Sequence, residues 1–176
     1  MAKLRKTLGD VNAPSTVALM RLIETQSKTT IANWTLNYAE DKMLPLFHKY
    51  SPDDCRPANA IAAAREWLAG KVKLPYVKNI ILNECHAAAR ELDNNPIAQA
   101  AARAIGQSCS SIHAVTHSLG LYFYAAAAVA YDRVGTEADT EQYKQIAEEV
   151  CADYTDALRA VAVEDEANPA KCKWNC

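Results

Sequence analysis

Only one fully charged side chain, that of Arg103, occurs between Asn95 and Tyr131, and most side chains in the first half of this stretch are small. Positions four apart drift by about 40° around an α-helix, so a row of small residues at this spacing winds over much of the helix surface. Such a row runs through Ala98, Ala102, Gly106, Ser110, Ala114 and Ser118. A helix that has small side chains on nearly all sides and no charged face is typical of the centre of a bundle.

Composition supports a helical fold for the whole chain. Half of the residues are hydrophobic but only 7% are aromatic, and the β-branched residues are scattered rather than alternating. A length of 176 residues allows one domain with a sizeable core and is short for two. We therefore expect an all-α, single-domain bundle of about six or seven helices around an alanine-rich central helix at about residues 96–117. Residues 1–163 would form the helical domain and residues 164–176 a C-terminal tail.

Residues that favour helix termini mark the expected boundaries. Asn95 is expected to cap the central helix, and Asp139 with Gln142 has the spacing of a capping box. Pro45 should kink or end the second helix, and Gly120 should interrupt the central one. The expected helices cover about residues 14–26, 30–48, 57–70, 75–94 and 96–116, then a sixth continuing to 134 and a seventh over 139–163.

Charge and hydropathy exclude several classes of protein. The first nine residues carry a few positive charges but no apolar run of a signal peptide follows them, so we expect a cytoplasmic protein. The apolar segment 119–131 falls short of the roughly 20 residues that cross a bilayer. Because the net charge is −2 and no basic stripe is present, we expect no direct binding to nucleic acid and none to a membrane. The six cysteines are expected to be reduced core residues.

One cluster of residues has the chemistry of a metal site. Cys109, His113 and His117 follow one another at intervals of four, so they face much the same way on a helix. Cys85 and His86, on the preceding helix, could face them across a groove. Imidazoles and thiolates are ligands that zinc accepts.

Other features of the sequence argue against metal. The zinc-protease pattern needs a glutamate beside the first histidine, where this chain has Ala114, and no carboxylate occurs from 94 to 131. We therefore expect His86, His113 and His117 to make structural hydrogen bonds or to line a groove, with no metal and no cofactor.

Nucleophilic catalysis is not indicated either. The serines and cysteine at 108–111 have histidines nearby in sequence, but the orienting carboxylate would have to come from another helix. The chain has no glycine-rich phosphate loop and no G-x-S-x-G turn. We expect no catalytic residue and no enzyme activity.

Arg103 needs a partner, because a charge on an enclosed helix is costly unless it is paired. We expect a carboxylate from a neighbouring helix, and Glu91 and Glu84 are the nearest candidates in the sequence. Arg103 is thus expected to be a structural polar residue.

A short turn before the third helix combines charge with rigidity. Asp53, Asp54 and Arg56 lie between two prolines. The turn either holds the start of its own helix or presents a preformed polar surface to a partner. These three residues are our candidates for partner binding.

Four blocks of sequence follow one another within about residues 30–135: Asp54-x-Arg56-Pro57-x2-Ala60-Ile61-x2-Ala64-Arg65, His86-Ala87-Ala88-Ala89-Arg90, Ala101-Ala102-Arg103-x2-Gly106, and His113-x3-His117-x-Leu119-Gly120-x3-Tyr124-Ala125-Ala126. Their order and spacing resemble the bacterial immunity-five-like family of immunity proteins. Members usually have Gly-His-Ala after the arginine block, where this chain has Gly106-Gln107-Ser108. The departure at Gln107 removes a third histidine near His113, which argues further against a metal.

The resemblance implies an all-α cytoplasmic protein that protects its producer by binding and blocking a cognate protein toxin of a polymorphic toxin system. A slightly acidic chain favours a basic partner such as a nuclease. Two other interpretations stay open: a helical scaffold or homodimer of unknown role, and a small-molecule or metal-binding bundle.

Overall fold

The computed structural model describes residues 4–174, which form helices and no strand. Two short π-helical turns, η1 and η2, join their flanking helices without a break, so the described residues contain seven continuous helices. The predicted all-α bundle is confirmed. In chain order the elements are α1 (Pro14–Glu24), α2 (Lys28–Tyr38), η1 (Ala39–Met43), α3 (Leu44–Tyr50), α4 (Arg56–Leu68), α5 (Leu74–Ile80), η2 (Ile81–Cys85), α6 (His86–Glu91), α7 (Pro96–Ser110), α8 (His117–Val134) and α9 (Thr140–Arg159).

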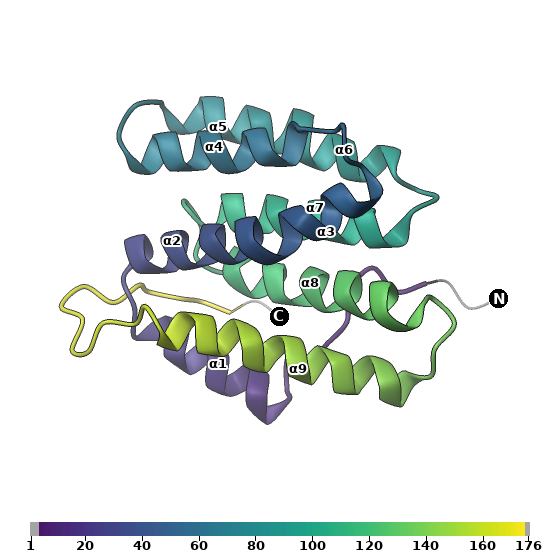
Figure 1. Ribbon diagram of the computed structural model, residues 1–176. Helices are drawn as coiled ribbons and strands as arrows, with labels where there is room; N and C mark the ends of the chain where they lie inside the picture. Colours follow the sequence, from purple (N-terminus) through teal and green to yellow (C-terminus); the bar gives the residue numbers. More distant parts are fainter. Residues whose placement is uncertain (1–3, 175–176) are drawn as a thin grey trace.

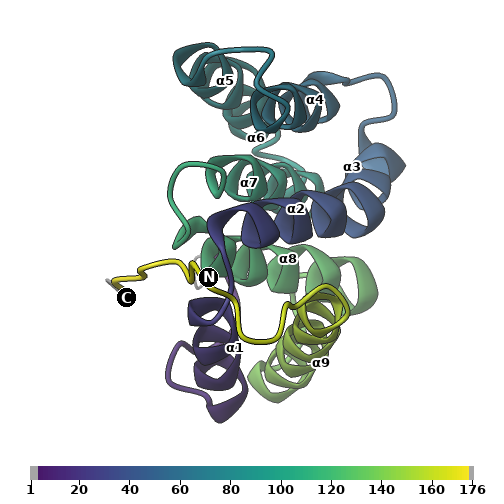
Figure 2. The same cartoon turned by 90° about the vertical axis from the view of Figure 1, so that its left-hand side faces the viewer.

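The helices are stacked in layers (Figures 1 and 2). The continuous helix α5–α6 lies beside α4 in the first layer, and α7 lies beside the continuous helix α2–α3 in the second. α8 follows, and α1 and α9 form the last layer. α7 contacts α2, α3, α4, α6 and α8, so it occupies the middle of the bundle, as predicted.

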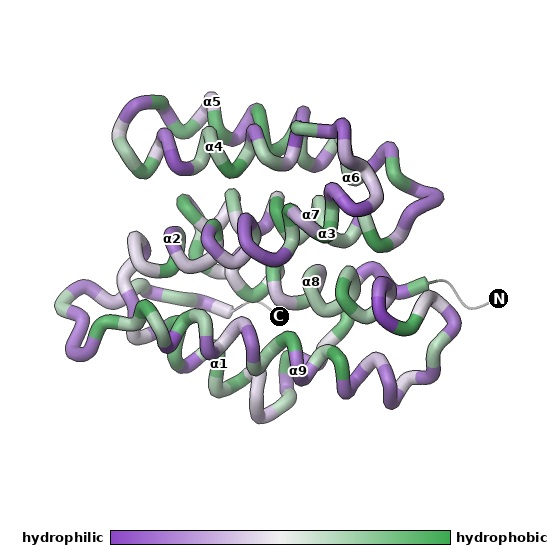
Figure 3. Tube along the Cα trace, viewed as in Figure 1, coloured by the Kyte–Doolittle hydropathy of each residue, from purple (hydrophilic) through white to green (hydrophobic). Residues whose placement is uncertain are grey.

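Burial shows that α7 shares the centre with α8. No residue of α7 is exposed, and in α8 only Arg133 and Val134 are. Hydrophilic residues lie mainly on the outer helices and the connecting turns (Figure 3). Two neighbouring helices, rather than one, therefore form the interior of this bundle.

The end of α7 differs from the sequence prediction. α7 stops at Ser110, residues 111–116 form turns, and α8 begins at His117, so Gly120 lies inside α8 instead of interrupting a helix. Serine hydroxyls explain the early end, because they compete with the backbone for carbonyl groups. The Oγ atom of Ser110 donates to the Gly106 carbonyl at 2.9 Å, and further serines in the same turn bond likewise.

Pro45 produces the expected distortion. Its missing N–H cannot bond the carbonyl four residues earlier, and the π turn η1 ends at Met43, two residues before it. The helix then continues to Tyr50 rather than ending at Pro45.

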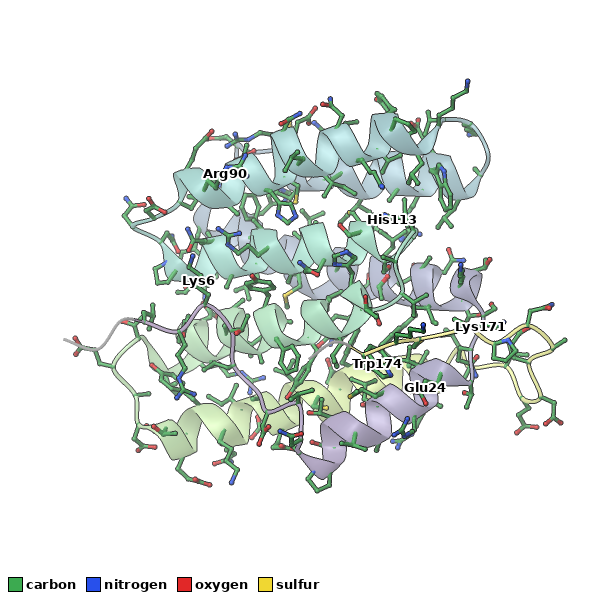
Figure 4. All side chains as sticks on the ribbon, turned by 180° about the vertical axis from the view of Figure 1, so that it is seen from behind. Lys6, Glu24, Arg90, His113, Lys171 and Trp174 are labelled. Atoms are coloured by element: carbon green, nitrogen blue, oxygen red, sulfur yellow. The ribbon has the colours of Figure 1, made fainter. Side chains whose placement is uncertain are left out.

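Both ends of the described chain lie against the bundle. The N–H of Leu8 donates to the Phe123 carbonyl at 3.1 Å, which holds the N-terminal segment on α8. In the C-terminal tail, Nε1 of Trp174 donates to Oε1 of Glu24 at 2.6 Å (Figure 4). Among the described residues, no helix is long and apolar enough to cross a membrane.

Candidate functional site

The turn before α4 is held by one arginine. Nη2 of Arg56 donates to Oδ2 of Asp54 at 2.8 Å and to Oε2 of Glu91 at 2.7 Å. The guanidinium lowers the pKa of both carboxyl groups, so both are ionised at neutral pH. Asp53 is exposed and makes no side-chain hydrogen bond with the described residues. The structure thus joins Asp54 to Arg56 and leaves the Asp53 carboxylate facing solvent.

The prediction that Glu91 or Glu84 pairs with Arg103 is wrong. Glu91 is engaged by Arg56, and Glu84 accepts a hydrogen bond from Asn59 at 3.4 Å. Both carboxylates of the η2–α6 segment therefore face α4 instead of α7. Nε of Arg103 is buried and has no hydrogen-bond partner within residues 4–174. Proximity in the sequence suggested the pair, but the rotation of α6 about its axis prevents it.

Arg103 instead lines a cavity of about 210 Å³ between α7 and the N-terminal segment. Arg5 and Lys6 contribute two further cations to its wall, and Asp93 contributes a carboxylate.

His86 packs directly on α7 at a glycine. A Cβ atom at Gly106 would lie only 2.4 Å from Cε1 of the His86 ring, so any other residue at this position would displace the ring. Burial, followed by the charges of Arg103 and Arg90, holds the pKa of His86 below its usual value. Its Nδ1 is buried without a partner among the described residues. His86 is therefore a neutral, tightly packed side chain.

His113 and His117 stand close together at the start of α8, with ring centroids 5.9 Å apart. Nδ1 of His117 lies 2.7 Å from Oε1 of Gln107. Burial lowers the pKa of both imidazoles. His117 is therefore held across the junction of α7 and α8, whereas Nδ1 of His113 is buried without a partner among the described residues.

The thiols expected near the histidines are core groups. Cys109 is fully buried, and burial raises the pKa of its thiol to about 12. Sγ of Cys85 donates to the Ala102 carbonyl at 3.3 Å. Across residues 4–174 no three histidine, cysteine or acidic side chains are placed to hold a metal ion.

A set of cations that the sequence did not reveal lies around this region. Lys6 and Arg90 appear on the same face as His113 (Figure 4). Arg90 and Arg103 both act on His86, and Lys78 acts on His113. None of these four cations forms an ion pair with the described residues. We call Lys6, Lys78, Arg90 and Arg103 the basic face.

Sequence inspection missed the basic face because its members come from three separate segments. A basic stripe is most easily seen in a sequence when the cations share one face of one helix. Here the N-terminal segment contributes Lys6, the continuous helix α5–α6 contributes Lys78 and Arg90, and α7 contributes Arg103.

Comparison with known proteins gives one finding. Residues 21–157, more than half of the chain, match the family described as Imm-5 like putative immunity protein. No curated protein and no solved structure shows significant similarity to the chain. The matched region runs from the last turn of α1 to the last turn of α9 and includes Arg56, Arg103 and the three histidines. The chain therefore belongs to the Imm-5 like family of immunity proteins.

Proposed function

We propose that this chain is an immunity protein that binds one partner toxin in the cytoplasm and blocks it by stoichiometric contact. Family membership over residues 21–157 carries the proposal. It points to binding rather than catalysis, so the relevant chemistry is that of a protein interface.

The contact surface includes the turn before α4, with Asp53, Asp54 and Arg56 as its polar groups. Arg56 is shared between two carboxylates and fixes the turn against α6. A fixed turn loses little conformational entropy when it binds, which favours affinity. The exposed Asp53 carboxylate supplies the free charge of this surface.

The proposal also includes the chemical class of the partner toxin. A net charge of −2 favours a basic toxin such as a nuclease, but only weakly. The charges that face the partner decide association, and Asp53 would attract a cation at that point.

Co-expression with the toxin encoded by the adjacent gene tests the proposal. The wild-type chain should restore growth and form a complex of one chain per toxin, measured by light scattering on a sizing column. Asp53→Lys should weaken binding by about tenfold or less, as for an interface charge at the rim.

Glu66→Lys is the matched control, since Glu66 is an exposed carboxylate of α4 that makes no side-chain hydrogen bond with the described residues. It should bind as the wild type does. If the wild-type chain neither binds the toxin nor restores growth, the proposal fails, and a helical scaffold or homodimer becomes the better interpretation.

A further inference from the structure

The cavity beside Arg103 holds more positive than negative charge. Its wall contains three cations, Arg5, Lys6 and Arg103, and one carboxylate, Asp93. None of the three cations forms an ion pair with the described residues. Asp93 accepts a hydrogen bond from Gln99 at 3.2 Å. Although the whole chain is slightly acidic, this cavity therefore attracts anions.

Arg103 is the group best placed to bind an anion. Its Nε is buried and unpartnered, whereas its two terminal nitrogens are neither buried nor bonded to the described residues. A partly buried guanidinium without a counter-charge is unfavourable, and a carboxylate can satisfy two of its N–H groups at once.

Further cations near the cavity add to its positive electrostatic potential. Arg90 lies on the same face as Lys6 (Figure 4), and burial, followed by the charges of Arg103 and Arg90, lowers the pKa of His86. The carboxylates of Glu84 and Glu91 are engaged on the α4 side. Any anion that approaches this face therefore meets an excess of positive charge.

The size of the cavity limits what can enter. Pockets for small molecules usually measure about 300–1,000 Å³, whereas this one measures about 210 Å³. It has room for one side chain. Leu4, on its wall, is 37% exposed. Exposed apolar groups around a charged centre are typical of protein interfaces.

We propose that this cavity receives an aspartate or glutamate side chain of the partner toxin, whose carboxylate pairs with Arg103 and Lys6. This inference rests on the proposed function and names the chemistry by which the toxin is recognised. The connection between α6 and α7, which contributes Asp93, lies at the same end of the bundle as the turn before α4 (Figure 1), so one partner can contact both.

Binding of a catalytically inactive form of the adjacent-gene toxin provides the first test. Arg103→Gln should weaken binding by about 30-fold or more, because it removes the partly buried member of the charge pair, and Lys6→Glu should weaken binding by about tenfold, because Lys6 is exposed. Lys71→Glu is the matched control: Lys71 is exposed, has no ion pair with the described residues, and lies in the α4–α5 connection at the opposite end of the bundle. Thermal melts of every variant establish that it is folded.

A second measurement does not depend on the toxin. Titration of the nitrogen-15-labelled chain with a hexaglutamate peptide should shift the Arg103 Nε–H resonance to saturation, and Lys6→Glu should abolish the shift. A single-stranded DNA hexanucleotide is the comparison probe, and it should produce a smaller shift because a nucleotide exceeds the cavity.

The outcomes separate the two proposals. If the toxin binds and the Arg103 and Lys6 variants bind as tightly as the wild type, the inference is overturned while the proposed function stands. If the peptide shifts Arg103 but the toxin does not bind, the cavity chemistry stands and the proposed function fails. A larger shift with DNA than with hexaglutamate would overturn the inference in favour of nucleic acid.

Discussion

Nδ1 of His117 lies 2.7 Å from Oε1 of Gln107, and this contact joins the start of α8 to the last turn of α7. An amide oxygen can only accept, so Nδ1 of His117 carries the proton. Gly120 makes room for the contact, because a Cβ atom there would lie 2.4 Å from the same oxygen. The two central helices are therefore joined by a polar contact that depends on a glycine.

Close packing around α7 predicts the effect of enlarging its side chains. Ala102→Leu and Gly106→Leu should each destabilise the protein by about 1–3 kcal/mol or more, because the first is fully buried and the second would displace the ring of His86. Chemical denaturation measures the change. Ala62→Leu, at an exposed position of α4, is the control and should change the free energy of unfolding by less than about 0.5 kcal/mol. Unaltered stability in both central variants would contradict the burial of α7.

A buried tyrosine supplies a second stability test. Tyr154 of α9 is fully buried, and its hydroxyl donates to the Ser118 carbonyl at 3.0 Å. Tyr154→Phe leaves that carbonyl without the bond and should cost about 1–2 kcal/mol. Tyr143→Phe is the control, since the hydroxyl of Tyr143 donates to the Gly135 carbonyl and accepts from the Ala138 N–H, and neither residue is buried, so water can replace the hydroxyl as their partner. Equal losses in the two variants would mean that burial of the bond has no effect.

Local signals in the sequence predicted the parts of the fold that local chemistry controls. The side chain of Asn95 accepts from the Ala98 N–H at 3.0 Å, and Asp139 forms the capping box with Gln142, as the spacing indicated. Each cap depends on residues within one helical turn, so inspection of the sequence is sufficient.

Features that depend on distant contacts could not be predicted in this way. The predicted partner of Arg103 was incorrect because the carboxylate of Glu91 accepts a hydrogen bond from Arg56, which lies 35 positions away in the chain. The basic face was missed because its cations meet only after α5, α6 and α7 pack with the N-terminal segment. Helix rotation and long-range packing set both features, and neither has a local signature.

The histidines predict how stability depends on pH. His86, His113 and His117 all have a pKa below the usual value of 6.5, and burial is the main cause of each shift. The positive charges of Arg103 and Arg90 lower the pKa of His86 further, and that of Lys78 lowers the pKa of His113 further. The unfolded chain therefore binds more protons than the folded one as the pH falls below about 6.5, so folded stability decreases. Above that value these groups contribute no pH dependence.

Thermal melts at about pH 7 and about pH 5.5 measure this effect, because most carboxylates titrate below that range. The melting temperature should be lower at the acidic value. His86→Asn should reduce the difference between the two temperatures. A melting temperature that rises on acidification would contradict the neutral, buried state of the histidines.

The absence of a metal remains a prediction for the purified protein. His117 uses Nδ1 for Gln107, and the buried Cys109 keeps its proton, since its thiol pKa is about 12. A thiol must lose its proton to bind zinc. Elemental analysis should find zinc and iron well below one equivalent per chain. One equivalent that disappears in His113→Ala would overturn the structural role assigned to these residues.

The arginine of the turn before α4 provides the last test. Arg56→Ala removes hydrogen bonds to two carboxylates, Asp54 and Glu91, and the first of these is largely enclosed, with 20% of its side chain exposed. The variant should lose about 1 kcal/mol of stability, more than an exposed pair usually contributes. Arg159→Ala is the matched control, because Arg159 and Asp156 form an exposed pair within one helix, with side chains 65% and 70% exposed. Its effect should be below about 0.5 kcal/mol. If Arg56→Ala unfolds at the same denaturant concentration as the wild type, the guanidinium does not fix the turn, and the rigidity invoked for toxin binding has no support.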